Sequence, residues 1–190
     1  MQLIKEPLFF EDGRVRGIIA LINNVTEQKL LRRKLKERSI HDKLTGIYNR
    51  GYLDEYIHKL KENGVYLICV ISADCDRLKH INDTYGHMVG DDHIRLCVSL
   101  MKTIFPEQSE LFRMGGEEFM AFIPGIDSEK AAALIGEVKD NFSSYTIKGI
   151  SVSISLGFSM INDESDSIVE CMQHSDVDMY RDKRSKKRRA

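Results

Sequence analysis

At residues 111–123 the chain reads LFRMGGEEFMAFI. Two apolar segments flank a Gly-Gly pair, which is typical of two antiparallel strands joined by a tight turn, because the central residues of the favoured turn need positive φ angles. Two adjacent carboxylates, Glu117 and Glu118, follow that pair. Carboxylates gathered at the tip of a hairpin indicate that something cationic meets them there.

A matching strand is predicted upstream, where residues 65–73 read VYLICVISA. Such a continuous apolar run is typical of a strand buried on both faces. It ends in Asp74-Cys75-Asp76. If this strand and the hairpin share a sheet, Asp74, Asp76 and Glu117 converge at one edge. Mg²⁺ takes a few carboxylate oxygens and completes its shell with water and phosphate oxygens, so this edge is a candidate magnesium site.

Composition places the chain among soluble globular proteins. Its 190 residues are 42% hydrophobic and 30% charged, enough for one full domain and part of another. No run is long enough to span a membrane, and no signal-peptide pattern is present. The four cysteines show no paired spacing, which favours reduced thiols in a cytoplasmic protein. These patterns describe the given chain, and both a free and a membrane-attached full-length protein are compatible with them.

Strand and helix patterns alternate around the hairpin. Besides the strand over 65–73, we expect a hairpin over 110–124 and a strand over 147–160. Helices are expected over 48–62, 128–142 and 166–183, and from residue 78 or 79 to 105 with an interruption near 85–90. This alternation predicts an α/β fold with a mixed central sheet wrapped by helices.

The GGEEF of residues 115–119 resembles the GGDEF motif, which names the bacterial diguanylate cyclase domain. Four further segments are similar to that family's motifs and occur in its order: residues 42–50, 74–91, 153–157 and 176–183. The resemblance covers roughly residues 41–188. It implies the palm architecture of class III nucleotide cyclases, and the condensation of two GTP molecules into cyclic di-GMP.

The resemblance also implies the roles of the acids and of one lysine. Asp74, Glu117 and the backbone carbonyl of Cys75 would bind Mg²⁺, with Mn²⁺ as an alternative, and Glu117 is the candidate proton acceptor. Lys79 would offset charge on the phosphates, helped by backbone N–H groups of residues 76–78. Without the resemblance, an acid at a strand end is usually solvated, and Gly-Gly is usually only a turn.

Guanine recognition is implied at the helix interruption. There the family binds the guanine edge with residues that correspond to Asn82 and Asp91, and His87 corresponds to a further substrate contact. An aspartate accepts hydrogen bonds from guanine N1 and its amino group, whereas adenine presents the opposite polarity, so Asp91 favours GTP over ATP. The competing interpretation is a simple interruption made of residues that tolerate turns.

The C-terminus is basic, with six lysines and arginines and no acid over residues 183–190. Lys183 matches the closing lysine of the family, and Lys187 falls where the family has an arginine; both are implied phosphate ligands. Lysine keeps the charge but lacks the bidentate fork, and Arg188 is a candidate substitute. A solvated tail and a nucleic-acid arm are the alternatives, although the resemblance implies no nucleic-acid partner.

Residues 8–22 are predicted to form two strands around an Asp12-Gly13 turn, followed by NNVTE at 23–27. This resembles the end of a PAS sensor domain. We therefore assign 1–26 to a PAS remnant, 27–40 to a linker helix and 41–190 to the cyclase domain. The linker is either an exposed helix or a dimeric coiled coil. Because one domain supplies half a site, a homodimer is expected, with the PAS region as its upstream partner.

Two further expectations concern regulation. Many family members carry R-x-x-D shortly before the Gly-Gly as a product-inhibition site, and here Pro106 and Ser109 stand at those positions. The main rival function is a catalytically silent domain that binds GTP and regulates a partner. The intact Asp74, Glu117 and Asn82 disfavour that alternative.

Overall fold

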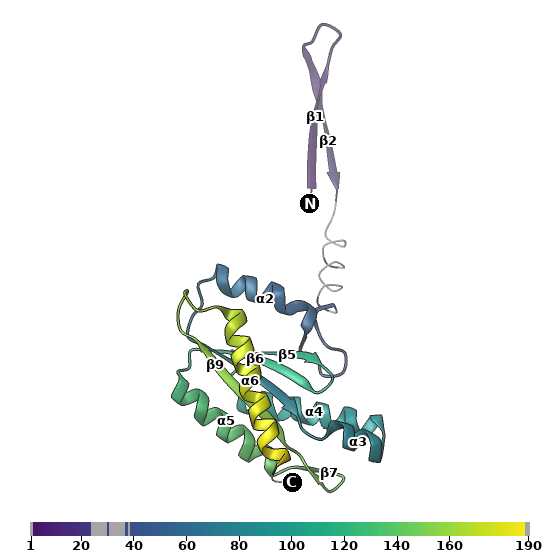
Figure 1. The fold of residues 1–190 in the computed structure, drawn as a ribbon. Coiled ribbons are helices and arrows are strands. Elements are labelled where there is room, and N and C mark those ends of the chain that lie inside the picture. Colours follow the sequence, from purple (N-terminus) through teal and green to yellow (C-terminus); the bar gives the residue numbers. More distant parts are fainter. Residues whose placement is uncertain (1, 24–29, 31–36, 38, 189–190) are drawn as a thin grey trace. The chain divides into compact units, whose positions relative to one another are not determined.

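The computed structural model describes residues 2–23, 30, 37 and 39–188. The chain divides into two compact units, Met1–Ile40 and His41–Ala190 (Figure 1). The first contains a hairpin of β1 (Gln2–Phe9) and β2 (Val15–Asn23), paired antiparallel. Gly13 has a φ of 81° in the connecting turn, which confirms the predicted hairpin. Most of the expected linker helix, 27–40, lies outside the described residues.

The second unit is built on a five-stranded sheet in the order β3-β5-β6-β4-β9. These strands are β3 (Tyr48–Asn49), β4 (Ile68–Cys75), β5 (Glu110–Gly115), β6 (Glu118–Pro124) and β9 (Ile154–Ile161). The β3–β5 pair is parallel and the other pairs are antiparallel. All eight residues of β4 are buried. The sheet is therefore mixed, as the sequence predicts.

Five helices cover the sheet: α2 (Arg50–Glu62), α3 (Leu78–Tyr85), α4 (His87–Ile104), α5 (Ser128–Ser143) and α6 (Ile168–Lys187) (Figure 1). Alternate residues of β4 pack against helices on opposite faces of the sheet. Cys69 and Ile71 belong to the core that includes α4 and α5. Ser72 points to the other face, where its hydroxyl lies 2.8 Å from that of Ser175 in α6. A strand covered on both faces explains why its sequence is almost entirely apolar.

Several predicted boundaries are wrong, each for a local reason. The strand expected from residue 65 begins at 68, because Leu67 has a φ of 59° and interrupts the extended backbone. The strand expected over 147–160 is divided: β7 (Thr146–Ile147) and β8 (Ile150–Ser151) form a small hairpin before β9. Its turn residues, Lys148 and Gly149, both have positive φ.

The helices also differ at their ends. The helix expected from residue 48 begins at 50, because residues 48–49 pair with β5 as β3. The interruption expected near 85–90 is a single residue, Gly86, whose φ is 85°. The last helix runs over 168–187 rather than 166–183. Among the described residues, no helix is both long enough and apolar enough to cross a bilayer.

Candidate active site

The end of β4 and the turn of the β5–β6 hairpin meet at one edge of the sheet. Asp74 lies opposite Glu118 in the antiparallel register. The backbone N–H of Cys75 donates to the carbonyl of Glu117 at 2.9 Å. The hairpin therefore neighbours the buried strand as the sequence analysis requires.

Asp74 and Glu117 converge on a single ammonium group from α6. Lys183 Nζ lies 2.6 Å from Asp74 Oδ2 and 3.2 Å from Glu117 Oε1. Asp74 is only 3% exposed. Burial raises the pKa of its carboxyl to about 6, although the hydrogen bond from Lys183 acts in the opposite direction. A second positive charge beside Asp74 would therefore stabilise its ionised carboxylate.

The residues at this edge fit a hard divalent cation. Asp74 Oδ1 is buried and has no hydrogen-bond partner, and an unpaired buried oxygen beside a second carboxylate is a natural cation ligand. The Cys75 side chain is buried in the core, so only its backbone carbonyl is a candidate ligand. The described residues contain no group of three or more His, Cys, Asp or Glu side chains placed to hold a metal ion, so a cation here would use two carboxylates and main-chain oxygen.

Asp76 lies at the same edge, but its hydrogen bonds go to residues at the start of β9 rather than to the Asp74–Glu117 pair. Its carboxylate accepts hydrogen bonds from the hydroxyls of Ser153, at 2.8 Å, and Ser155, at 2.7 Å. Its backbone N–H donates to the carbonyl of Ser153 at 3.0 Å. The three acids therefore lie at one edge as expected, but only Asp74 and Glu117 share Lys183 as a partner. Because the backbone N–H of Asp76 donates to Ser153, it is not available to the anion site expected over residues 76–78.

A residue that the sequence analysis did not single out, Lys186, completes the basic side of the site. Its Nζ lies 3.1 Å from Asp76 Oδ2 and also donates to the carbonyl of Ile154. Lys187 is exposed but lines the same small cavity of about 120 Å³, with Asp76, Arg77, Ser153, Lys183 and Lys186. Lys183, Lys186 and Lys187 share one face of α6. Their i, i+3, i+4 spacing is the sequence signal from which Lys186 could have been identified.

The N-terminus of α3 borders this cavity. Arg77, its N-cap, has a φ of 68° and no side-chain capping hydrogen bond. The first N–H groups of any helix lack intrahelical acceptors and favour anions. Lys79 is exposed in the same first turn. Backbone donors without a side-chain cap and two exposed cations, Arg77 and Lys79, therefore gather at this end of α3.

Asn82 and Asp91 lie on either side of the break between α3 and α4. A Cβ added at Gly90 would lie 1.8 Å from Asn82 Oδ1, so the absent side chain at Gly90 makes room for the Asn82 amide. Asp91 follows Gly90 and is exposed. His87, also exposed, begins α4. The structure thus brings Asn82 against Gly90 in α4, next to Asp91, while His87 lies in the first turn of the same helix.

Arg113 links the first family motif to the Gly-Gly turn. Asp42 Oδ1 accepts hydrogen bonds from the backbone N–H and hydroxyl of Thr45 and from Arg113 Nη1, the last at 3.0 Å. Arg113 Nε and Nη2 donate to the carbonyl of Gly116 at 3.1 and 2.8 Å. The sequence analysis missed this residue. Its signal was a charged side chain within the apolar stretch 111–114, two residues before the Gly-Gly turn.

Comparison with known proteins identifies the family. A sequence model of the family described as "Diguanylate cyclase, GGDEF domain" matches residues 39–189. The probable diguanylate cyclase DgcE of Escherichia coli K12 is 30% identical over 93% of this chain. An uncharacterised protein of Bacillus subtilis, YtrP, is 32% identical over 98%. The chain spans only 17% of DgcE and 33% of YtrP.

Solved structures agree with this assignment. The coiled coil and GGDEF domain of DgcB from Caulobacter crescentus, crystallised with c-di-GMP, superposes with a TM-score of 0.76 at 25% identity, covering 85% of this chain and 89% of that one. The diguanylate cyclase SiaD of Pseudomonas aeruginosa gives 0.71 at 28%, covering 84% and 64%. The shared palm-like fold, the family match over residues 39–189 and the meeting of the motif residues at one sheet edge show that the chain belongs to the GGDEF-domain diguanylate cyclase family.

Proposed function

We propose that residues 41–190 condense two GTP molecules into cyclic di-GMP and release pyrophosphate. The observation that carries this proposal is the pair of carboxylates, Asp74 and Glu117, which share one cation beside the uncapped start of α3 and the lysine face of α6. A pair of carboxylates next to anion-binding groups is the arrangement that nucleotidyl transfer needs.

Asp74, Glu117 and the carbonyl of Cys75 would hold Mg²⁺, or Mn²⁺ in its place, and the bound ion would make the attacking 3′-hydroxyl more acidic and offset phosphate charge. Glu117, which is partly exposed, accepts the proton of that hydroxyl. Lys183 pairs with both carboxylates, so the three groups together keep one net negative charge. A divalent ion held by Asp74 and Glu117 would compete with this ammonium, and Lys183 would then be available to a phosphate oxygen.

The remaining residues bind the substrate. The free N–H groups at the start of α3 and the ammonium of Lys79 receive the phosphates. Asn82 and Asp91 bind the guanine edge, and His87 contacts the substrate. Lys187, exposed on the lysine face of α6, adds a phosphate contact as a point charge.

The wider assignment follows from the same reasoning. We assign 1–26 to the end of a PAS sensor domain and 27–40 to the linker helix that carries its signal, in a cytoplasmic homodimer with no nucleic-acid partner. The apolar side chains of the β1–β2 hairpin support this assignment. Phe9 and Ile18 are more than half exposed within their unit, as expected of strands that pack on further PAS structure.

The decisive experiment is incubation with GTP and Mg²⁺, followed by chromatography of the nucleotides. Cyclic di-GMP and pyrophosphate are expected, and ATP should give no cyclic product because adenine N1 is an acceptor and cannot donate to Asp91 as guanine N1 does. GTP binding without product would instead identify a silent regulatory domain.

Activity is expected to depend on dimer formation. One chain carries one set of metal ligands and one guanine site, yet the reaction joins two GTP molecules. Specific activity should therefore rise with enzyme concentration and then reach a plateau. The measurement is the initial rate across a dilution series at saturating GTP, with light scattering to report mass. Constant specific activity at concentrations where only monomer is present contradicts the two-half-site mechanism.

Gly90→Ala is expected to weaken GTP binding with little loss of stability. The new methyl group would lie 1.8 Å from Asn82 Oδ1, and the flexible Asn82 side chain must move out of the guanine site. Loss of its hydrogen bonds should raise KM for GTP about tenfold. Steady-state kinetics and thermal unfolding test this together. An unchanged KM would show that Asn82 does not bind guanine.

Tight product inhibition through the usual R-x-x-D site is expected to be absent. Pro106 and Ser109 offer neither a cation for a phosphate nor a carboxylate for guanine. Calorimetry with cyclic di-GMP should show no tight binding outside the active site. Submicromolar binding that persists after substitution of both Asn82 and Asp91 would refute this expectation.

A further inference from the structure

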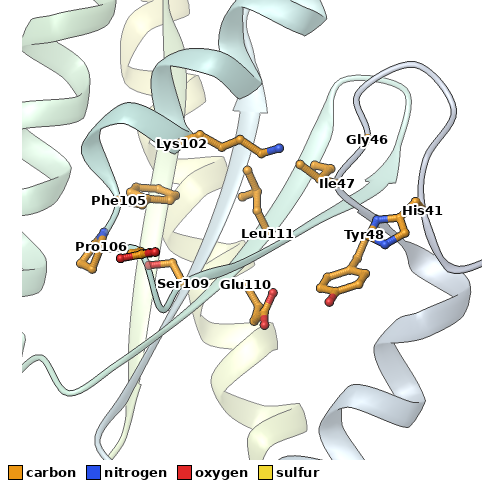
Figure 2. A pocket seen from close by; sticks show the side chains of 11 residues that line it. His41, Gly46, Ile47, Tyr48, Lys102, Phe105, Pro106, Ser109, Glu110 and Leu111 are labelled. Atoms are coloured by element: carbon orange, nitrogen blue, oxygen red, sulfur yellow. The ribbon is translucent and has the colours of Figure 1, made fainter. Parts of the chain in front are cut away.

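A second cavity of about 380 Å³ lies away from the active site (Figure 2). Its walls are the turn over residues 41–48, the last turn of α4, the loop over 105–109 and the start of β5. This volume is in the range of small-molecule sites. No residue assigned above to GTP or Mg²⁺ lines it, but Pro106 and Ser109, which stand where the family carries its R-x-x-D product-inhibition site, do.

The inner wall of this cavity is apolar. Ile47, Phe105 and Leu111 line it and are 4%, 7% and 7% exposed. On one side the rings of His41 and Tyr48 stack at 4.7 Å with an interplanar angle of 21°. Apolar side chains with a stacked aromatic pair at the edge suit a hydrophobic or aromatic ligand group.

Two opposite charges line the same cavity without pairing. Lys102 comes from α4 and Glu110 from β5, and in the view of Figure 2 Leu111 lies between them. Among the described residues, neither makes an ion pair within 4.0 Å. Burial raises the pKa of the Glu110 carboxyl, as expected where no cation lies close enough to compensate fully.

Two buried polar atoms at this cavity also lack partners. They are His41 Nδ1 and Ser109 Oγ. Buried polar atoms in folded proteins are normally hydrogen-bonded, and exceptions indicate a missing partner. At the active site the corresponding exception is Asp74 Oδ1, on a residue assigned to the metal. The second cavity therefore has hydrogen-bonding capacity that the chain itself does not use.

We propose that this cavity binds a zwitterionic α-amino acid with an aromatic or branched apolar side chain. Its carboxylate pairs with Lys102, its ammonium pairs with Glu110, and its side chain covers Ile47 and Phe105. A second carboxylate on the rim, Glu107, leaves the lining with one lysine and two glutamates. This excess of negative charge disfavours nucleotides and other phosphate esters.

The test is calorimetry of the whole chain with L-phenylalanine and L-leucine, without GTP or Mg²⁺. Saturable binding of at least one is expected. For phenylalanine, two analogues each lack one charge: the N-acetyl derivative has no ammonium, and the amide has no carboxylate. Each should bind about tenfold more weakly, because each loses one charge-assisted hydrogen bond. These comparisons need no altered protein, so a misfolded variant cannot obscure the answer.

Two variants then assign each charge to its partner. Lys102→Met should remove the preference for phenylalanine over its amide, and Glu110→Gln should remove the preference over the N-acetyl derivative. Lys130→Met, at an exposed position on α5, is the control and should change neither preference. Absence of saturable binding, binding of either analogue as tightly as phenylalanine, or loss of binding in Asn82→Ala but not in Lys102→Met would each overturn the proposal. Because GTP turnover is not measured, failure here leaves the cyclase proposal untouched.

Discussion

Replacing Asp74 by Asn, or Glu117 by Gln, is expected to reduce cyclic di-GMP formation by about 10³-fold or more. Both replacements keep the side-chain volume and remove a negative charge. The loss should be severe because the two carboxylates act on the same cation: Lys183 Nζ lies within 3.2 Å of both. With either one neutral, the remaining charge is too small to hold a divalent ion beside bound triphosphate.

The assay needs a readout that is independent of turnover. Mn²⁺ binding followed by electron paramagnetic resonance should weaken in both variants, while circular dichroism shows an unchanged fold. Lys183 keeps one carboxylate partner in each variant, which protects the fold. Glu137→Gln is the matched control, because Glu137 is an exposed acid on α5. Product formation and Mn²⁺ affinity close to those of the parent chain in either variant would remove that residue from the site.

The second large effect is expected on stability, at Gly157 in β9. A Cβ built at this position would lie 2.1 Å from the backbone nitrogen of Met179 and 2.3 Å from the carbonyl oxygen of Ser175, both in α6. Backbone atoms cannot rotate away as a side chain can, so Gly157→Val must push α6 from the sheet. Overpacking of this kind should cost about 3 kcal/mol or more, lowering Tm by roughly 6–12 °C.

The matched control for this substitution is Gly136→Ala. Gly136 is exposed in the interior of α5, and a Cβ there would meet nothing within 4 Å. Removing a helical glycine should stabilise the chain by about 0.5–1 kcal/mol. Thermal unfolding of the two variants should therefore move in opposite directions. Because α6 also carries Lys183 and Lys186, Gly157→Val should lose cyclase activity too. An unchanged Tm in Gly157→Val would show that α6 does not pack directly on β9.

Local patterns were sufficient for the elements that frame the site. The continuous apolar run over 65–73 specified the central strand observed at 68–75, because a strand covered on both faces has no solvent side to alternate with. The Gly-Gly pair specified the hairpin turn, where Gly116 has a φ of 49°. Short motifs then placed Asp74 and Glu117 at the ends of these strands. Boundaries failed where a residue other than glycine takes a positive φ, as at Leu67 and Lys148.

The sequence by itself therefore determined the family, the α/β sheet and the identities of the acids at its edge, since these depend on local periodicity and motif spacing. Only the tertiary structure decided that Lys183 lies between Asp74 and Glu117, that Lys186 rather than Lys187 contacts Asp76, and that a cavity joins Lys102 to Glu110. Lys183 and Asp74 are 109 residues apart in the chain. Which lysine of α6 reaches the acids depends on the rotation of that helix against β9, and the close approach at Gly157 fixes that rotation through contacts no local pattern encodes.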